Sequence, residues 1–146
     1  MLVLLRQQKN NLKSLLKTIT GKRNAIVANN ISEIEKLTSD EEKLLRVINQ
    51  TEKLRLDCLA EFTKNASADS DSLNMDDYIS AISNTLNVQQ QKEFSDLRSE
   101  IKETTKQVMQ VNQQIKYVII QSRSLLNDIV SAIFKDRNNS LLDVKI

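Results

Sequence analysis

The chain has 146 residues, with one glycine, one cysteine, no proline, no histidine and a formal net charge of +2. Glycine and proline supply most of the dihedral angles that tight turns need, so this composition excludes sandwiches, barrels and repeated strand–helix units. The absence of histidine excludes histidine-based triads and His-ligated zinc. We therefore expect an all-α protein that binds partners and has no catalytic, cofactor-binding or metal-binding residues. A lone cysteine cannot form an internal disulfide, so the expected location is the reducing cytoplasm.

The first helix is predicted over residues 2–28. Apolar residues recur along it every seven positions, as in an α-helical seam; they are Leu5, Leu12, Ile19 and Ile26. Gly21 lies inside this helix and weakens it relative to alanine. Asn29 and Asn30 are expected to end the helix, because asparagine tolerates left-handed dihedral angles and favours turns.

Charge is distributed unevenly between the first two helical regions. Residues 1–30 contain basic residues and no acidic one, whereas residues 31–62 are acidic overall. We favour the interpretation that the basic first helix lies against the acidic second one, which would steer their antiparallel pairing. The alternative is a basic helix that binds phosphate groups or an anionic membrane surface.

A second helical region is predicted over residues 31–62. The sequence at 39–42, Ser-Asp-Glu-Glu, resembles a capping box, so the region is either one long helix or a short helix followed by a long one. Glu52 and Arg55 lie near its apolar seam, where a local ion pair is favoured over a catalytic dyad. Cys58 is expected to be a small buried thiol.

The following segment is the least regular part of the sequence. Residues 64–74 are small, polar and acidic, which predicts a loop. They lack the glycine and the glutamate that an EF-hand calcium loop requires. A short helix is predicted over residues 75–86.

The last helix, predicted over residues 89–137, carries the longest pattern in the chain. From Phe94 to Ala132 the seam residues follow one another by three and four positions without a slip, as in a sustained heptad repeat, and only Thr104 and Ser122 among them are polar. We expect this main seam to be needed for folding, including its later members Ile115, Val118, Leu125 and Ile129.

The second half of this helix is apolar over a wider surface. A second stripe runs beside the main seam and consists of Ile119, Leu126 and Ile133. A helix that is apolar on most sides is buried on most sides. The wide surface is therefore either the core of a bundle or a surface kept for a partner, and periodicity alone does not decide between them.

Together these elements predict an elongated helical bundle or antiparallel coiled coil, with long N- and C-terminal helices and one short helix between them. We expect one helical domain over residues 1–137 and a mobile tail over 138–146. No stretch reaches the ~18 apolar residues that span a bilayer, so no membrane insertion is expected. Nucleic-acid binding is not expected either, because no aromatic residue interleaves with the basic stretch.

Three segments of the sequence, in order, resemble a known family. They are the basic-then-apolar stretch at 22–30, the acidic stretch at 34–45 with its paired glutamates, and the Val-Asn-Gln-Gln-Ile-Lys-Tyr-Val-Ile run at 111–119 followed by Ser122. They are similar to segments of the FlgN family of flagellar type III export chaperones, and Glu52 and Arg55 also fit its second helix. Ile115 stands where the family pattern has a second asparagine, which removes a polar group from the seam.

The resemblance implies a cytoplasmic chaperone, independent of ATP, that binds the C-terminal segments of the hook-filament junction proteins FlgK and FlgL and engages the export apparatus. It also implies that the binding surface lies in the C-terminal helix. The expected partner-binding residues are Val111, Asn112, Ile115, Val118, Ile119, Ser122, Leu126, Val130 and Ile133. The alternative is a structural coiled-coil subunit that oligomerises through its heptad seam, and a weak homodimer is compatible with both hypotheses.

Overall fold

The computed structural model describes residues 1–65 and 86–142, with side chains over 1–61 and 86–134. The described helices are α1 (Leu2–Val27), α2 (Ile31–Asn65) and α4 (Val88–Leu142). No strand occurs in these residues, and the prediction of an all-α helical bundle is confirmed. The predicted loop over 64–74 and the predicted short helix over 75–86 lie almost entirely outside the described residues.

The chain divides into two compact units, Met1–Val111 and Asn112–Ile146. The first contains α1, α2 and the N-terminal part of α4. Of the described elements, the second contains only the remainder of α4. This helix continues through Leu142, beyond its predicted end at residue 137. The division into a domain over 1–137 and a mobile tail stays a prediction.

The turn between α1 and α2 is built from two asparagines. Asn29 adopts a left-handed φ of 52°, its N–H donates to the Ile26 carbonyl at 3.0 Å, and the Asn30 N–H donates to the Ala25 carbonyl at 2.9 Å. This is the Schellman arrangement, which satisfies the last carbonyls of a helix. The Asn30 side chain then caps α2 by accepting the Glu33 N–H at 3.2 Å, as N-cap residues do. The predicted break at 29–30 is confirmed.

The helix α2 runs without interruption through residues 39–42, so the capping-box hypothesis is wrong. Two of its acidic residues are satisfied without ending the helix. Asp40 accepts a hydrogen bond from Lys43, one turn later, at 3.1 Å, and Glu41 pairs with Lys22 of α1. The same side chains therefore suit the surface of a helix as well as its start.

A capping box does occur at the start of α4. The Gln90 N–H donates to Asn87 Oδ1 at 2.9 Å, and the Asn87 N–H donates to Gln90 Oε1 at 3.1 Å. The two reciprocal bonds satisfy amide groups that have no partner within the helix.

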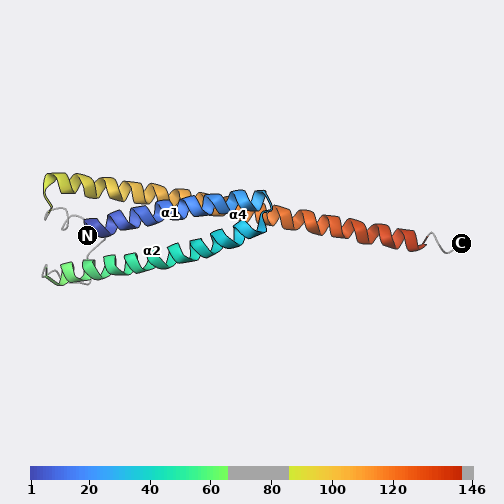
Figure 1. Cartoon of the computed structure of the whole chain (residues 1–146), viewed down its shortest axis with the longest axis horizontal. Coiled ribbons are helices and arrows are strands. Elements are labelled where there is room, and N and C mark those ends of the chain that lie inside the picture. Colours follow the sequence, from blue (N-terminus) through green and yellow to red (C-terminus); the bar gives the residue numbers. More distant parts are fainter. Residues whose placement is uncertain (66–85, 143–146) are drawn as a thin grey trace. The chain divides into compact units, whose positions relative to one another are not determined.

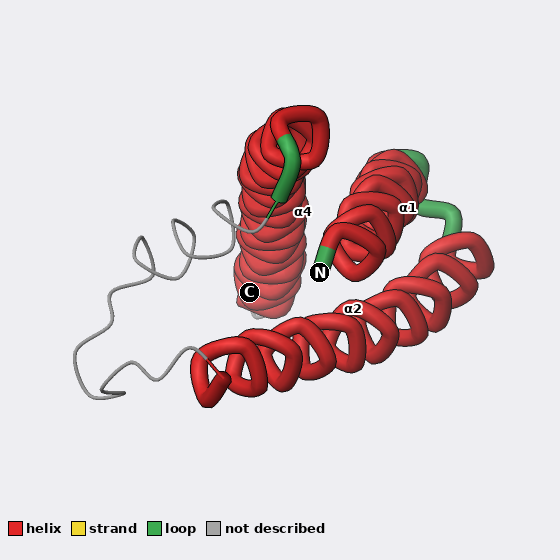
Figure 2. The backbone as a smooth tube through the Cα atoms, turned by 90° about the vertical axis from the view of Figure 1, so that its left-hand side faces the viewer, coloured by secondary structure: helices red, strands yellow, loops and turns green. Residues whose placement is uncertain are grey.

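In the first unit, α1 lies beside both α2 and the N-terminal part of α4 (Figure 1). Figure 2 shows these helices in a triangular arrangement. The α1–α2 pair is antiparallel, because Gln8 contacts Glu52 whereas Lys22 contacts Glu41. The α1–α4 pair is parallel, because the Arg6–Glu93 and Lys13–Glu100 pairs both join residues 87 positions apart.

The core of the first unit follows the predicted seams. Leu5, Phe94 and Leu97 form a buried cluster against which Leu59 of α2 packs, so all the described helices of this unit meet there. Ile19 is fully buried. Buried threonines are satisfied within their own helices, because the Thr104 hydroxyl donates to the Glu100 carbonyl at 2.8 Å and that of Thr51 to Val47 at 2.9 Å.

Cys58 is exposed, so the prediction of a buried thiol is wrong. It lies inside α2, but on the side of that helix that faces solvent. Its neighbours Asp57 and Ala60 are exposed as well. Cysteine is compatible with either side of a helix, and its position relative to the seam is the better guide.

The basic residues of α1 pair mainly with α4. Arg6 Nε lies 2.5 Å from Glu93 Oε1 and Lys13 Nζ lies 2.7 Å from Glu100 Oε2, whereas Lys22 pairs with Glu41 of α2. The expectation that the basic helix pairs with the acidic second helix therefore holds for Lys22 only. Regional net charge misses the two glutamates of α4, which stand one heptad apart toward α1. Their hydrogen bonds to Arg6 and Lys13 lower the pKa of both carboxyl groups.

The predicted local ion pair in α2 is confirmed. Arg55 donates to both carboxylate oxygens of Glu52, from Nε at 2.8 Å and from Nη2 at 2.7 Å, and Gln8 Nε2 of α1 donates to Glu52 at 3.0 Å. The hydrogen bond from Arg55 is the main reason that the pKa of Glu52 is lowered. The pair thus ties α2 to α1 through Gln8.

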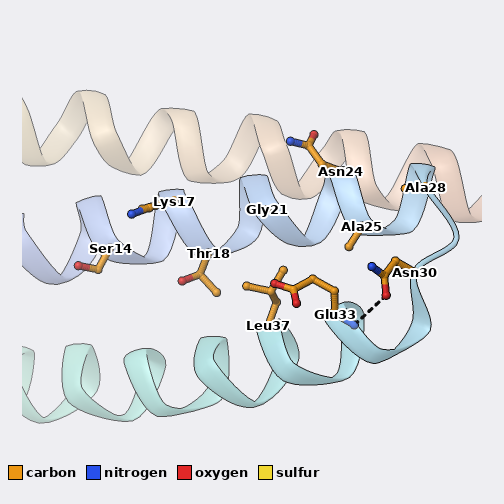
Figure 3. Close-up of a pocket in the computed structure, with 10 residues that line it drawn as sticks. All are labelled: Ser14, Lys17, Thr18, Gly21, Asn24, Ala25, Ala28, Asn30, Glu33 and Leu37. Atoms are coloured by element: carbon orange, nitrogen blue, oxygen red, sulfur yellow. Dashed lines mark hydrogen bonds between the residues drawn. The ribbon is translucent and has the colours of Figure 1, made fainter.

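Gly21 lies where α1 approaches α2 closely, and α1 continues through it. A Cβ atom at Gly21 would lie 3.4 Å from Leu37 Cδ1, and Figure 3 shows the Leu37 side chain directed toward this part of α1. Beside it lies an open groove of about 630 Å³, whose α1 wall consists largely of small side chains; they include Ser14, Thr18, Gly21, Ala25 and Ala28.

Candidate partner-binding surface

The composition of α4 changes at one heptad position between the two units. When Phe94 is taken as position a, the e positions of the first heptads are polar: Arg98, Thr105 and Asn112. The next three are aliphatic: Ile119, Leu126 and Ile133. The apolar face therefore widens from the a and d positions to a, d and e. Such a face is typical of a helix packed in a bundle, whereas an a/d seam is the narrower contact of a coiled coil.

Burial changes along the same helix. In the first unit Phe94 is 6% exposed and Leu97 is 3% exposed. In the second unit Ile115 is still buried at 7% exposure, whereas Leu125 is 61% and Ile129 is 47% exposed. The exposed apolar side chains in the second unit together form what we call the distal surface: Tyr117, Ile119, Ile120, Leu125, Leu126, Ile129, Val130, Ile133 and Phe134.

Few charged residues accompany the distal surface. Between residues 112 and 134 the sequence has only Lys116, Arg123 and Asp128 as charged side chains. A large apolar patch with so little charge is unusual for a monomeric soluble protein and marks an interaction site. A helix without tertiary contacts is also marginally stable in water, so a partner that covers this segment would stabilise it.

The structure separates the nine predicted partner-binding residues into two groups. Val111 and Val118 are half-buried, and Ile115 is buried. Asn112 and Ser122 are exposed polar residues. The exposed apolar members are Ile119, Leu126, Val130 and Ile133. Only this last group is available as apolar contact area.

The expectation that the main seam is core throughout is wrong for Leu125 and Ile129. Both continue the heptad spacing, but no described residue covers them. They therefore join the distal surface, together with Ile120 and Phe134, which the sequence analysis did not single out. The available signal was the loss of charged residues at the flanks of the seam after residue 116.

The described residues offer no site for a metal ion, since they contain no group of three or more carboxylate, cysteine or histidine side chains close enough to hold one. Within residues 1–65 and 86–142, no helix combines the length and the apolar character needed to cross a membrane. The chemistry of the distal surface is therefore that of apolar contact, with a few charges at its edges.

A sequence profile of the FlgN protein family matches residues 1–142. The chain belongs to the FlgN family. Searches of curated proteins and of solved structures gave no significant match. Membership in the FlgN family implies a role as a flagellar export chaperone, and this family is not known for enzymatic activity. FlgN chaperones bind flagellar proteins for export, so an exposed apolar surface agrees with the family's role.

Proposed function

We propose that this FlgN-family chain is a cytoplasmic chaperone that binds the C-terminal segments of the hook-associated proteins FlgK and FlgL and delivers them to the flagellar type III export apparatus. Its contact residues lie on the C-terminal half of α4, among the nine predicted positions 111–133. The chain acts by binding and carries out no catalysis.

The observation that carries this proposal is the exposure of the distal surface. Ile119, Leu126 and Ile133 are 50%, 61% and 56% exposed, although they are large aliphatic residues at seven-residue spacing. Burying an aliphatic side chain of this size contributes about 1.5–3 kcal/mol. Several such anchors on one helix face suffice for a stable complex with an amphipathic client segment, which recognises helical faces by the same spacing.

The test is a triple variant that removes the stripe, Ile119→Gln, Leu126→Gln and Ile133→Gln. We expect it to keep its helicity by circular dichroism and its melting temperature, because these side chains are already exposed. We also expect it to lose binding of a C-terminal FlgK fragment in isothermal titration calorimetry. The matched control carries Ser124→Gln, Asn127→Gln and Ser131→Gln, which change exposed polar positions of the same segment, and it should bind normally.

Two results would contradict the proposal. If the triple variant unfolds, the stripe belongs to the folded core. If it folds and binds the fragment with unchanged affinity, the client site lies elsewhere on the chain.

A second candidate function is that of a structural coiled-coil subunit. It is favoured by the heptad spacing, which continues from the buried Leu97 to the exposed Leu125 without a slip. Copies of the chain could then cover the distal surface for one another. Light scattering separates the candidates, because a subunit of this kind forms a stable oligomer without a client, whereas a chaperone tightens only when a client is added.

A further inference from the structure

The distal surface contains two heptad seams that share residues. The first follows the a and d positions and comprises Val118, Ser122, Leu125, Ile129 and Ala132. The second follows the e and a positions and comprises Ile119, Ser122, Leu126, Ile129 and Ile133. Both alternate steps of three and four, and each alone has the spacing that one partner helix needs. Ser122 and Ile129 lie on both.

A single helix covers one such seam. In the first unit, α4 meets two other helices at the Leu5–Phe94–Leu97 cluster, against which Leu59 also packs. There the e positions of α4 are polar; the exposed Arg98 is one of them. The distal surface continues the same seam and adds an aliphatic e position, so it has the width for a further pair of helices.

The two outer edges of the distal surface carry opposite charges. Lys116 and Arg123 lie at b positions, beside the second seam, whereas Asp128 lies at a g position, beside the first seam. A helix on the second seam is favoured when it carries an acidic residue at its outer edge, and a helix on the first seam when it carries a basic one. Two copies of one helix do not fit both edges equally.

We propose that the client occupies the distal surface with two amphipathic helices of one polypeptide, one on each seam, with an acidic outer edge beside Arg123 and a basic outer edge beside Asp128. The client helices thereby complete a bundle around α4, as α1 and α2 do in the first unit. This inference rests on the proposed chaperone function and specifies what the client must present.

Two adjacent leucines provide the test. Leu125 belongs only to the first seam and Leu126 only to the second, and each is 61% exposed. The full chain is compared with Leu125→Gln, with Leu126→Gln and with the control Ser124→Gln. Affinity for the C-terminal FlgK fragment is measured by isothermal titration calorimetry, and stoichiometry by light scattering. We expect both leucine variants to weaken binding at least tenfold, the control to change it less than threefold, and one client to bind per chain.

The outcomes separate this inference from the proposed function. If only one leucine variant weakens binding, the client is a single helix and the inference is wrong while the chaperone function stands. Two clients per chain also overturn it, because each seam then takes its own polypeptide. If the unsubstituted chain binds no fragment, or if it forms an oligomer that excludes the fragment, the proposed function fails and the inference fails with it. Should a glutamine variant lose helicity, Leu125→Ala and Leu126→Ala give the same comparison without a new polar group.

Discussion

The two parts of α4 have the same heptad spacing and opposite surroundings. Leu97 and Leu125 both occupy d positions, yet they are 3% and 61% exposed. The apolar spacing of a helix therefore predicts that a seam exists and where it runs, but not what covers it. What differs between the two parts is the charge at the flanks: Glu93 and Glu100 bind basic residues of α1 in the first part, whereas the second has aliphatic e positions.

The sharpest way to break this comparison is to truncate both d-position leucines. We expect Leu97→Ala to lower the free energy of unfolding by ~2–5 kcal/mol, because it leaves a cavity in a buried cluster. Leu125→Ala should change it by less than about 0.5 kcal/mol, as exposed substitutions do. Urea denaturation followed by circular dichroism measures both. Equal losses would mean that Leu125 is covered within the folded chain, and the distal surface would then be core.

A substitution at Gly21 sharpens the account of how closely the first unit is packed. Glycine in a helix interior costs ~0.5–1 kcal/mol relative to alanine, and the added Cβ would make a van der Waals contact with Leu37 at 3.4 Å. We expect Gly21→Ala to raise the free energy of unfolding by about that amount, in the same denaturation experiment. A loss of stability would show that α1 and α2 approach more closely than an alanine allows.

The pH dependence of stability tests the ion pairs of the first unit. The pKa of Glu52 is lowered from its ordinary value of 4.5, chiefly by the Arg55 hydrogen bond. The stabilisation it provides is present above that ordinary value and is lost as the pH falls through the lowered pKa. Because Glu52 is partly exposed, we expect a loss of about 0.5–1 kcal/mol. Denaturation midpoints between pH 6 and pH 3 should therefore fall less steeply for Glu52→Gln than for the unsubstituted chain.

Much of the fold follows from local rules that the sequence displays. The seam residues Leu5, Leu12 and Ile19 are buried as their spacing predicts, and the paired asparagines at 29–30 do end α1. The capping box was misplaced because its residues also suit a helix surface: Asp40 and Glu41 find partners there, while Asn87 and Gln90 form the actual box. Residue types alone do not separate these cases.

The candidate site was predicted less completely than the fold. The stripe of Ile119, Leu126 and Ile133 was found from its spacing, because it lies beside a seam that was already identified. Leu125 and Ile129 were assigned to the core, because a heptad repeat has no mark that shows where its partner helices end. That limit depends on distant packing. The α1–α4 offset of 87 residues places Asn24 level with Val111, and α1 ends soon afterwards at Val27.

The same offset has a consequence for the order in which the first unit folds. The Lys22–Glu41 contact closes a loop of 19 residues, whereas the Arg6–Glu93 contact joins residues 87 apart. Loop-closure entropy rises with length, and contacts between distant residues form slowly. The α1–α2 hairpin therefore assembles first and α4 docks onto it in a later step. Substitutions in the hairpin, such as at Ile19, should slow folding, whereas loss of the Arg6–Glu93 pair should mainly speed unfolding.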